Sequence, residues 1–161
     1  HGVASDKKIQ KEEFITMDFG AYYEGYVSDI TRTVYYGNNI TDRHKEIYNT
    51  VLEAQLLGIE TIKEGVMSDE VDKVVRNFFN EKGYGKYFGH GLGHGIGAEI
   101  HELPYLSSAS QIELKENMVV TSEPGLYFDG WGGVRIEDDV VVKKDGREVL
   151  NKSNKKLIIL S

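Results

Sequence analysis

The chain has 161 residues, of which 40% are hydrophobic and 28% charged, so it is long enough for a core and most simply forms one domain. Its net charge of −7 and the lack of a long basic run argue against nucleic acid or an anionic membrane as partner. The absence of cysteine excludes disulfides, thiolate nucleophiles and cysteine-ligated zinc. No apolar run is long enough to span a bilayer and no signal peptide opens the sequence, so we expect a cytoplasmic protein.

The first predicted element is a β-hairpin over residues 14–36 that turns at Glu24-Gly25. A hairpin with an even loop pairs residues whose numbers sum to an odd value, so Asp18 and Asp29 share one face, directly opposite or one step diagonal. Two carboxylates this close destabilise a sheet unless a cation lies between them. The alternative is a solvated pair on an exposed face, but apolar neighbours leave neither face clearly polar.

Two helices are predicted next, and the short link between them makes them an antiparallel pair. The first helix has Thr41 as its N-cap, carries apolar residues at helical spacing and stops at Gly65. The second helix is expected to be capped by Ser68 and to end at Gly83.

A glycine-rich segment follows, with glycine at every odd position from 89 to 97. The spacing of His90 and His94 suits one helical turn, but five glycines at about 1 kcal/mol each make a helix untenable. We therefore predict an extended segment whose glycine face allows a neighbouring chain to approach closely and whose other face carries both histidines. A chance glycine-rich loop is the alternative.

The middle of the chain is predicted to be a loop over residues 99–110, which carries His101, and then a strand over residues 118–123. Pro124-Gly125 breaks this strand, so Glu123 lies at its end. Strand ends often carry functional groups, which makes Glu123 a candidate site residue.

The last part is predicted to be a second hairpin with a continuous strand over residues 134–142 and a return strand over 148–150. Glu137 lies within the first of these strands. Residues 157–160 are predicted to form a final buried strand.

The candidate metal ligands are Asp18, Asp29, His94, Glu123 and Glu137, each on a strand or at a strand end. Four carboxylates and one imidazole are too anionic for one small cation and suit two hard or borderline metals better than a structural zinc. Paired metals about 3.5–4 Å apart typically polarise a carbonyl and generate a hydroxide from bridging water. A purely structural role is disfavoured, because burying four carboxylates without a cation is very costly.

Several short motifs occur in a fixed order along the chain. They are Asp18-x-Gly, Gly-Tyr-x-Ser-Asp29-Ile-Thr-Arg-Thr, His90-Gly-Leu-Gly-His94-Gly-x-Gly, His101-Glu-x-Pro, Ser-Glu123-Pro-Gly-Leu-Tyr127 and Val-Arg135-Ile-Glu137-Asp-Asp. Together they resemble the Xaa-Pro peptidases, the aminopeptidase P and prolidase group of the pita-bread metallopeptidases.

The resemblance implies an α+β pita-bread fold, with a curved, mostly antiparallel sheet and a helix pair packed behind it. Residues 1–161 would be the C-terminal catalytic domain, incomplete on its N-terminal side, because the family has a first helix pair before the residue that matches His1. The face which that pair would cover is expected to leave an apolar patch over the first hairpin. The chain is expected either to form a homodimer or higher oligomer through this patch or to need the missing helix pair, and to be weakly active or inactive by itself.

The resemblance also implies a dinuclear site holding two divalent ions, most simply manganese, with cobalt or zinc as alternatives. Asp18 and Asp29 would hold one ion, His94 and Glu123 the other, with Asp29 and Glu137 bridging both. Glu123 would also carry the proton between the attacking hydroxide and the leaving nitrogen.

Further residues are expected around this site, four of them by the same resemblance. His1 and His101 would contact the scissile carbonyl and the proline residue, and Arg135 and Tyr127 would support the site. Thr31 shares a face with Asp29 and is expected to orient it. For His90 a packing role and a functional role are equally open, as are support and solvation for Asp138 and Asp139.

The expected reaction is hydrolysis of the bond between an N-terminal residue and a following proline, as an aminopeptidase or a dipeptidase. A methionine aminopeptidase would share the five ligands, but the Ser-Asp-Ile-Thr-Arg-Thr run and the His-Glu-x-Pro segment resemble the proline-directed branch. The other alternative is a binding module of this fold without catalysis. The chain keeps all five ligand positions, which argues against such a module.

Overall fold

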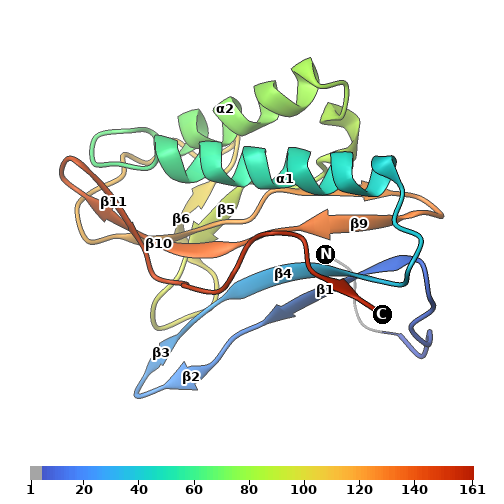
Figure 1. Ribbon diagram of the computed structural model, residues 1–161. Helices are drawn as coiled ribbons and strands as arrows, with labels where there is room; N and C mark the ends of the chain where they lie inside the picture. The colour runs from blue at the N-terminus through green and yellow to red at the C-terminus, as the bar shows by residue number, and fades with distance from the viewer. Residues whose placement is uncertain (1–4) are drawn as a thin grey trace.

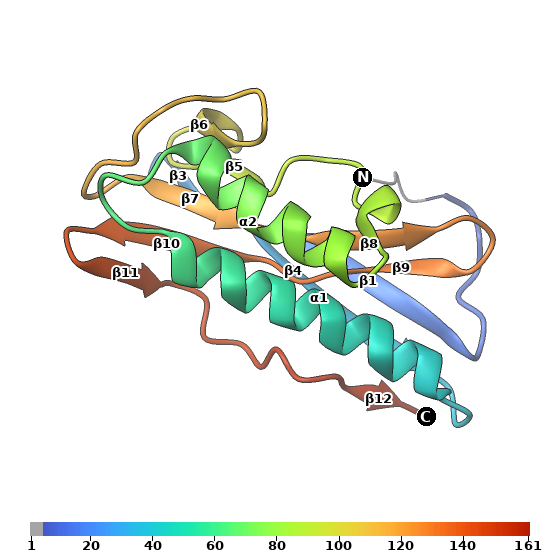
Figure 2. The ribbon, with the colours of Figure 1, turned by 90° about the horizontal axis from the view of Figure 1, so that it is seen from above.

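Two antiparallel helices lie side by side over a set of strands in the computed structural model, which describes residues 5–161 (Figure 1). They are α1 (Asp42–Thr61) and α2 (Ser68–Glu81), and a short 3-10 helix, η1 (Gly85–Tyr87), follows them. Figure 2, seen from above, shows the pair covering the strands. None of the helices in the described part of the chain is long and apolar enough to cross a membrane.

The predicted N-cap residue is confirmed for α1 and wrong for α2. Thr41 is the N-cap of α1, and its hydroxyl accepts a hydrogen bond from the backbone N–H of His44. The prediction that Ser68 caps α2 is wrong, because Met67 holds the N-cap position. The hydroxyl of Ser68 is instead buried and donates to the carbonyl of Ser110, so it joins the helix to a distant loop.

The strands form short ladders that are antiparallel, as predicted, except for one parallel pair, β4 with β12. Their orders are β1-β4-β12, β11-β10-β7-β5-β6, β2-β3 and β8-β9. Their bounds are β1 (Glu13–Phe19), β2 (Tyr22–Tyr23), β3 (Tyr26–Val27), β4 (Ile30–Tyr36), β5 (Gly93–Gly95), β6 (Glu102–Leu106), β7 (Val119–Ser122), β8 (Gly125–Phe128), β9 (Gly132–Arg135), β10 (Asp138–Lys143), β11 (Gly146–Val149) and β12 (Ile159–Leu160).

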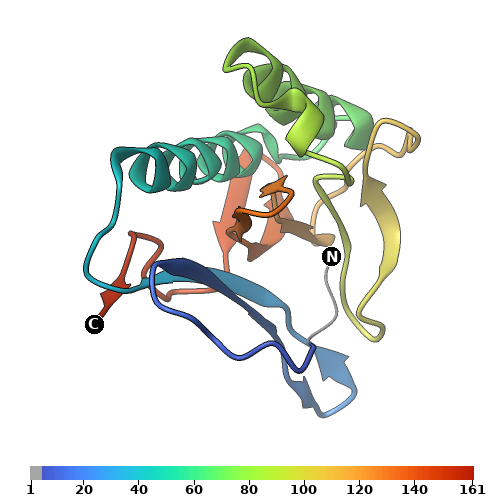
Figure 3. The same cartoon turned by 90° about the vertical axis from the view of Figure 1, so that its right-hand side faces the viewer.

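The first hairpin has the predicted turn and register. Glu24 and Gly25 both have positive φ angles, 49° and 90°, which suit a two-residue hairpin turn. Asp18 is paired directly with Thr31, so Asp29 lies one step diagonal from Asp18. Figure 3 shows this blue hairpin across the molecule from the helices, with orange and red strands between the two.

The core lies between the helix pair and the strands behind it. Val51 of α1 and Phe79 of α2 are fully buried there with Leu126 of β8 and Val140 of β10. The apolar stripes of both helices therefore face the strands.

Three predicted strands or loops differ from the structure. The predicted loop over residues 99–110 contains β6, an edge strand, where a proline within a strand is tolerated. The predicted strand over residues 134–142 is broken at 136–137, because the N–H of Glu137 leaves the ladder to bond across to β4. The final strand is not buried, since Ile159 and Leu160 remain 49% and 44% exposed.

Candidate metal centre

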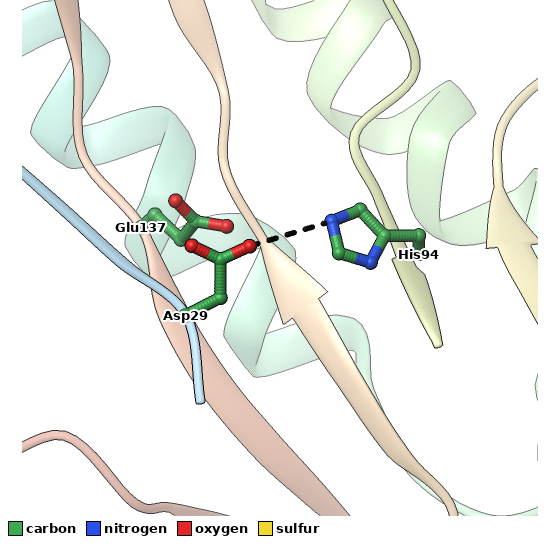
Figure 4. Close-up of side chains that lie close together, drawn as sticks. All are labelled: Asp29, His94 and Glu137. Atoms are coloured by element: carbon green, nitrogen blue, oxygen red, sulfur yellow. Dashed lines mark ion pairs between the residues drawn. The ribbon is translucent and has the colours of Figure 1, made fainter. Parts of the chain in front are cut away.

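Asp29, His94 and Glu137 converge from three separate parts of the chain (Figure 4). Asp29 lies just before β4, His94 in β5, and Glu137 at the break between β9 and β10. One ligand atom of each residue lies within 4.8 Å of the corresponding atoms of the other two. The three residues are only 7%, 5% and 1% exposed, so the structure places two carboxylates and an imidazole together away from water.

Glu123 joins this group, and Asp18 lies at its edge. A carboxylate oxygen of Glu123 is 3.2 Å from Nε2 of His94, and Asp29 Oδ2 is 3.8 Å from the same nitrogen. Asp18 is more exposed, and its Oδ2 accepts a hydrogen bond of 2.5 Å from Arg135 Nη2. The structure therefore brings four of the five predicted ligands together and holds the fifth on an arginine beside them.

The His94 ring is fixed with Nε2 toward the carboxylates. Its Nδ1 lies 3.0 Å from the carbonyl oxygen of Gly95, and only a protonated nitrogen can bond a carbonyl, so Nδ1 is the donor. Burial lowers the pKa of His94, but the hydrogen bond to Glu123 and the nearby Asp29 carboxylate raise it overall. Deprotonated Nε2 would be available as a ligand to a metal ion.

Two carboxyl groups of the cluster, Glu137 and Asp29, have raised pKa values. Burial, followed by the charges of Glu123 and Asp29, raises the pKa of Glu137 to about 9. Burial and the neighbouring Asp18 and Glu123 carboxylates raise the pKa of Asp29 to about 6. Burial and neighbouring like charges both disfavour the ionised carboxylates, and a bound cation would favour them.

A divalent cation also fits the hydrogen bonding of this cluster. Oε2 of Glu137 accepts a hydrogen bond from the hydroxyl of Thr31, but its buried Oε1 has no hydrogen-bond partner among the described residues. A buried carboxylate oxygen without a partner costs free energy. Oxygen atoms with one imidazole nitrogen are the donor set that manganese, cobalt and zinc accept.

A chain of hydrogen bonds links the remaining predicted residues to the cluster. The expectation that Thr31 orients Asp29 is wrong, because its hydroxyl donates to Glu137 at 2.5 Å and so orients Glu137 instead. Arg135 Nε donates to the Thr31 hydroxyl at 3.2 Å, and Arg135 Nη1 donates to the Tyr127 hydroxyl at 2.9 Å. The Tyr127 hydroxyl lies 3.0 Å from Nε2 of His90, which places His90 in the network.

A pocket of about 240 Å³ adjoins the cluster, lined by His94 and Glu123 among other residues. The exposed ring of His101 also lines it and meets the His94 ring edge-on, with centroids 4.3 Å apart. His1 lies outside the described residues.

Sequence reasoning missed two supporting groups, Thr121 and Asn151, and left the role of a third, Asp139, open. Thr121 donates to Glu123 at 3.2 Å and accepts from the backbone N–H of His94, and its place two residues before Glu123 on one strand could have revealed it. Asp139 is buried rather than solvated and accepts from the backbone of Asp29. Asn151 contacts the backbone of Asp29, but no local signal marks it.

Comparison with known proteins gives the family and the fold. The family model for metallopeptidase family M24 matches residues 1–144. An Xaa-Pro dipeptidase of Pyrococcus horikoshii is 48% identical over 158 residues, which cover 98% of this chain and 45% of that protein. The chain thus spans about 45% of the length of this relative.

Two solved structures are closely similar. One is an Xaa-Pro dipeptidase from Bacillus anthracis, with a TM-score of 0.96 and 57% identity over 99% of this chain and 45% of that one. The other is an X-Pro aminopeptidase from Thermotoga maritima, with a TM-score of 0.95 and 47% identity over the same shares. These matches confirm the predicted α+β pita-bread fold class.

Proposed function

Because the chain belongs to metallopeptidase family M24, we propose that it carries the metal site of a peptidase that cleaves before proline. The substrate would be a peptide with a free amino terminus and proline in second position, as the names of its similar proteins suggest. The observation that carries the proposal is the buried meeting of Asp29, His94 and Glu137. Residues 1–161 would then be a metallopeptidase catalytic domain.

We assign the five predicted ligands to two divalent ions, with manganese as the first expectation. Asp18 and Asp29 would hold one ion, His94 and Glu123 the other, and Asp29 and Glu137 both. When bound, the ions would lower the pKa of a shared water and polarise the scissile carbonyl. The unpartnered Oε1 of Glu137 and the raised carboxyl pKa values support this assignment.

The residues around the ligands would hold and move protons. Glu123, directly after β7 and on the wall of the pocket, would accept the proton of the attacking water and donate it to the leaving nitrogen. The Arg135 guanidinium and Thr31 hydroxyl would keep Glu137 turned toward the ions. His101 and His1 would contact the substrate, and Tyr127 and His90 would line its place.

Three alternatives within the fold stay open. An aminopeptidase and a dipeptidase are both among the closely similar structures, so substrate length is not assigned. A methionine aminopeptidase would use the same ligands, and a non-catalytic module would use none.

We also propose that the protein self-associates, since Phe19 and Tyr22 on the first hairpin are 58% and 73% exposed. The cytoplasm is its proposed location.

A side-by-side assay tests the proposal. The chain, supplied with manganese, is given an Xaa-Pro dipeptide, an Xaa-Pro tripeptide and a Met-Ala tripeptide, and release of the first residue is measured. We expect release from a proline substrate, and preferential release of methionine from the third would contradict the proposal.

The variant Glu123→Gln should lose about 10²–10⁴-fold in rate, the scale of a positioned acid–base. Glu116→Gln, at an exposed position, is the matched control. Calorimetric titration should show two manganese sites in the unaltered chain and fewer in Asp29→Ala.

A further inference from the structure

Asp29 lies outside every strand ladder, although it is buried. Strand β3 ends at Val27 and β4 begins at Ile30, so the ladder bonds of neither strand reach Asp29. Buried backbone N–H and C=O groups need partners, and here these must come from elsewhere in the chain.

The partners are two side chains more than 100 residues later in the sequence. Oδ2 of Asp139 accepts a 3.1 Å hydrogen bond from the backbone N–H of Asp29. Nδ2 of Asn151 donates to the backbone carbonyl of Asp29 at 3.3 Å. Oδ1 of Asn151 in turn accepts a 2.5 Å bond from the backbone N–H of Asp139, so the three residues close a ring of hydrogen bonds.

The strand register puts Asn151 in this place. Strand β11 ends at Val149, and the N–H of Leu150 still bonds to the carbonyl of Asp139 on β10. One residue later the side-chain amide of Asn151 takes over from the backbone. An amide offers a donor and an acceptor together, which an aspartate or an alanine at this position would not.

We propose that Asn151 and Asp139 are positioning residues that fix the backbone of Asp29 and so direct its carboxylate toward the metal ions. The inference rests on the proposed role of Asp29 as a ligand. Oδ2 of Asp29 is 3.8 Å from Nε2 of His94, and a ligand set of this kind works only when each member is held in place. Both bonds of Asn151 are to backbone atoms, so its contribution is to geometry alone.

Amide hydrogen exchange, measured residue by residue on the metal-free chain, tests the ring of bonds directly. In Asn151→Ala the N–H of Asp29 should exchange at least about 10-fold faster. The reason is that local opening at Asp29 then has to break only its bond to Asp139 and not the two bonds of Asn151 as well. The N–H groups of Val34 and Val140, which lie in β4 and β10, should keep their rates. Asn154→Ala, an exposed asparagine three residues later, is the matched control.

Titration with Co²⁺ tests the consequence for the metal. Asn151→Ala should weaken Co²⁺ binding by about 10–100-fold, the usual effect of losing a group that orients a ligand. It should also change the visible absorption of the bound Co²⁺, which reports ligand geometry. Asn154→Ala should change neither.

Several outcomes would overturn the proposal: unchanged exchange at Asp29, faster exchange at all three amides, or Co²⁺ binding equal to that of the unaltered chain. Absence of Co²⁺ binding by the unaltered chain would overturn it as well. If Asn151→Ala does not fold, Asn151→Asp keeps an acceptor for Asp139 and replaces the donor to Asp29 by a carboxylate oxygen, and the same criteria apply. Intact exchange and Co²⁺ results without peptide hydrolysis would count against the proposed function alone.

Discussion

Asp72 on α2 accepts a 3.1 Å hydrogen bond from the backbone N–H of Leu92, two residues before His94. The same carboxylate takes two bonds from Arg76, whose guanidinium also donates to the carbonyl of His90 at 2.9 Å. The glycine-rich segment is thus held by side chains of a helix, since much of its own backbone lies outside a ladder.

Replacing Asp72 by alanine should therefore destabilise the chain. The change leaves the N–H of Leu92 unpaired and removes the carboxylate partner of Arg76. We expect a loss of about 3 kcal/mol in unfolding free energy, since Arg76 is partly solvated and keeps its bonds to backbone carbonyls. Urea unfolding measures this. Lys73→Ala, at the exposed neighbouring position, should change stability little, and equal effects of the two changes would contradict the prediction.

The close approach predicted for the glycine face of this segment can be tested at Gly93. A Cβ atom there would lie 2.1 Å from the carbonyl oxygen of Thr121, which is backbone and cannot easily move. Gly93→Ala should cost about 1–3 kcal/mol or more and weaken metal binding through the adjacent His94. Gly89→Ala is the control, because a Cβ atom at Gly89 meets nothing within 4 Å. Thermal unfolding of both variants decides the matter, and a fully stable Gly93→Ala would rule out the close approach.

The metal-free chain should become less stable as the pH rises. The folded state keeps the Glu137 proton to about pH 9, whereas the unfolded chain loses it near the ordinary value of 4.5. Between these values the folded state binds more protons, so the contribution of this group to unfolding free energy falls with pH. Melting temperatures from about pH 5 to about pH 8 should decline less steeply in Glu137→Gln, whose amide does not titrate. Added manganese should flatten the decline as well, and parallel curves for the two proteins would refute the assignment.

A buried ion pair on β4 and β10 gives a fourth prediction. Asp138 is fully buried and accepts from Arg32 at 2.7 Å, from Lys155 at 2.7 Å and from Gln55 at 2.8 Å. Asp138→Ala leaves the buried Arg32 guanidinium uncompensated and should cost about 3–5 kcal/mol. The double variant Arg32→Met, Asp138→Ala should recover part of this loss in denaturant unfolding, and additive effects would show that the pair is not coupled.

Local rules predicted the parts of the fold that depend on near neighbours. The hairpin register followed from the turn at Glu24-Gly25 and the odd-sum rule, and it placed Asp18 and Asp29 correctly. The start of α1 followed from the Thr41 cap. The family's motifs then gave four residues that the structure brings together, because motif spacing reflects the whole fold.

The differences arise where a distant contact decides the local structure. The break at Glu137 exists because its N–H bonds to the carbonyl of Thr31, 106 positions earlier, and no property of the 134–142 sequence shows this. The bond of Thr31 to Glu137 instead of Asp29 depends on the same contact. Serine is a common helix cap, but the hydroxyl of Ser68 donates a hydrogen bond to the distant carbonyl of Ser110 instead.

The contact between Asn151 and Asp29 spans 122 positions of the sequence. A growing chain leaves the ribosome from its N-terminus, so the first hairpin emerges long before the residue that completes its hydrogen bonds. Closing so long a loop is entropically costly and comes late in folding. The carboxylate of Asp29 can therefore reach its final place only after residue 151 has been synthesised, and metal uptake should follow that step.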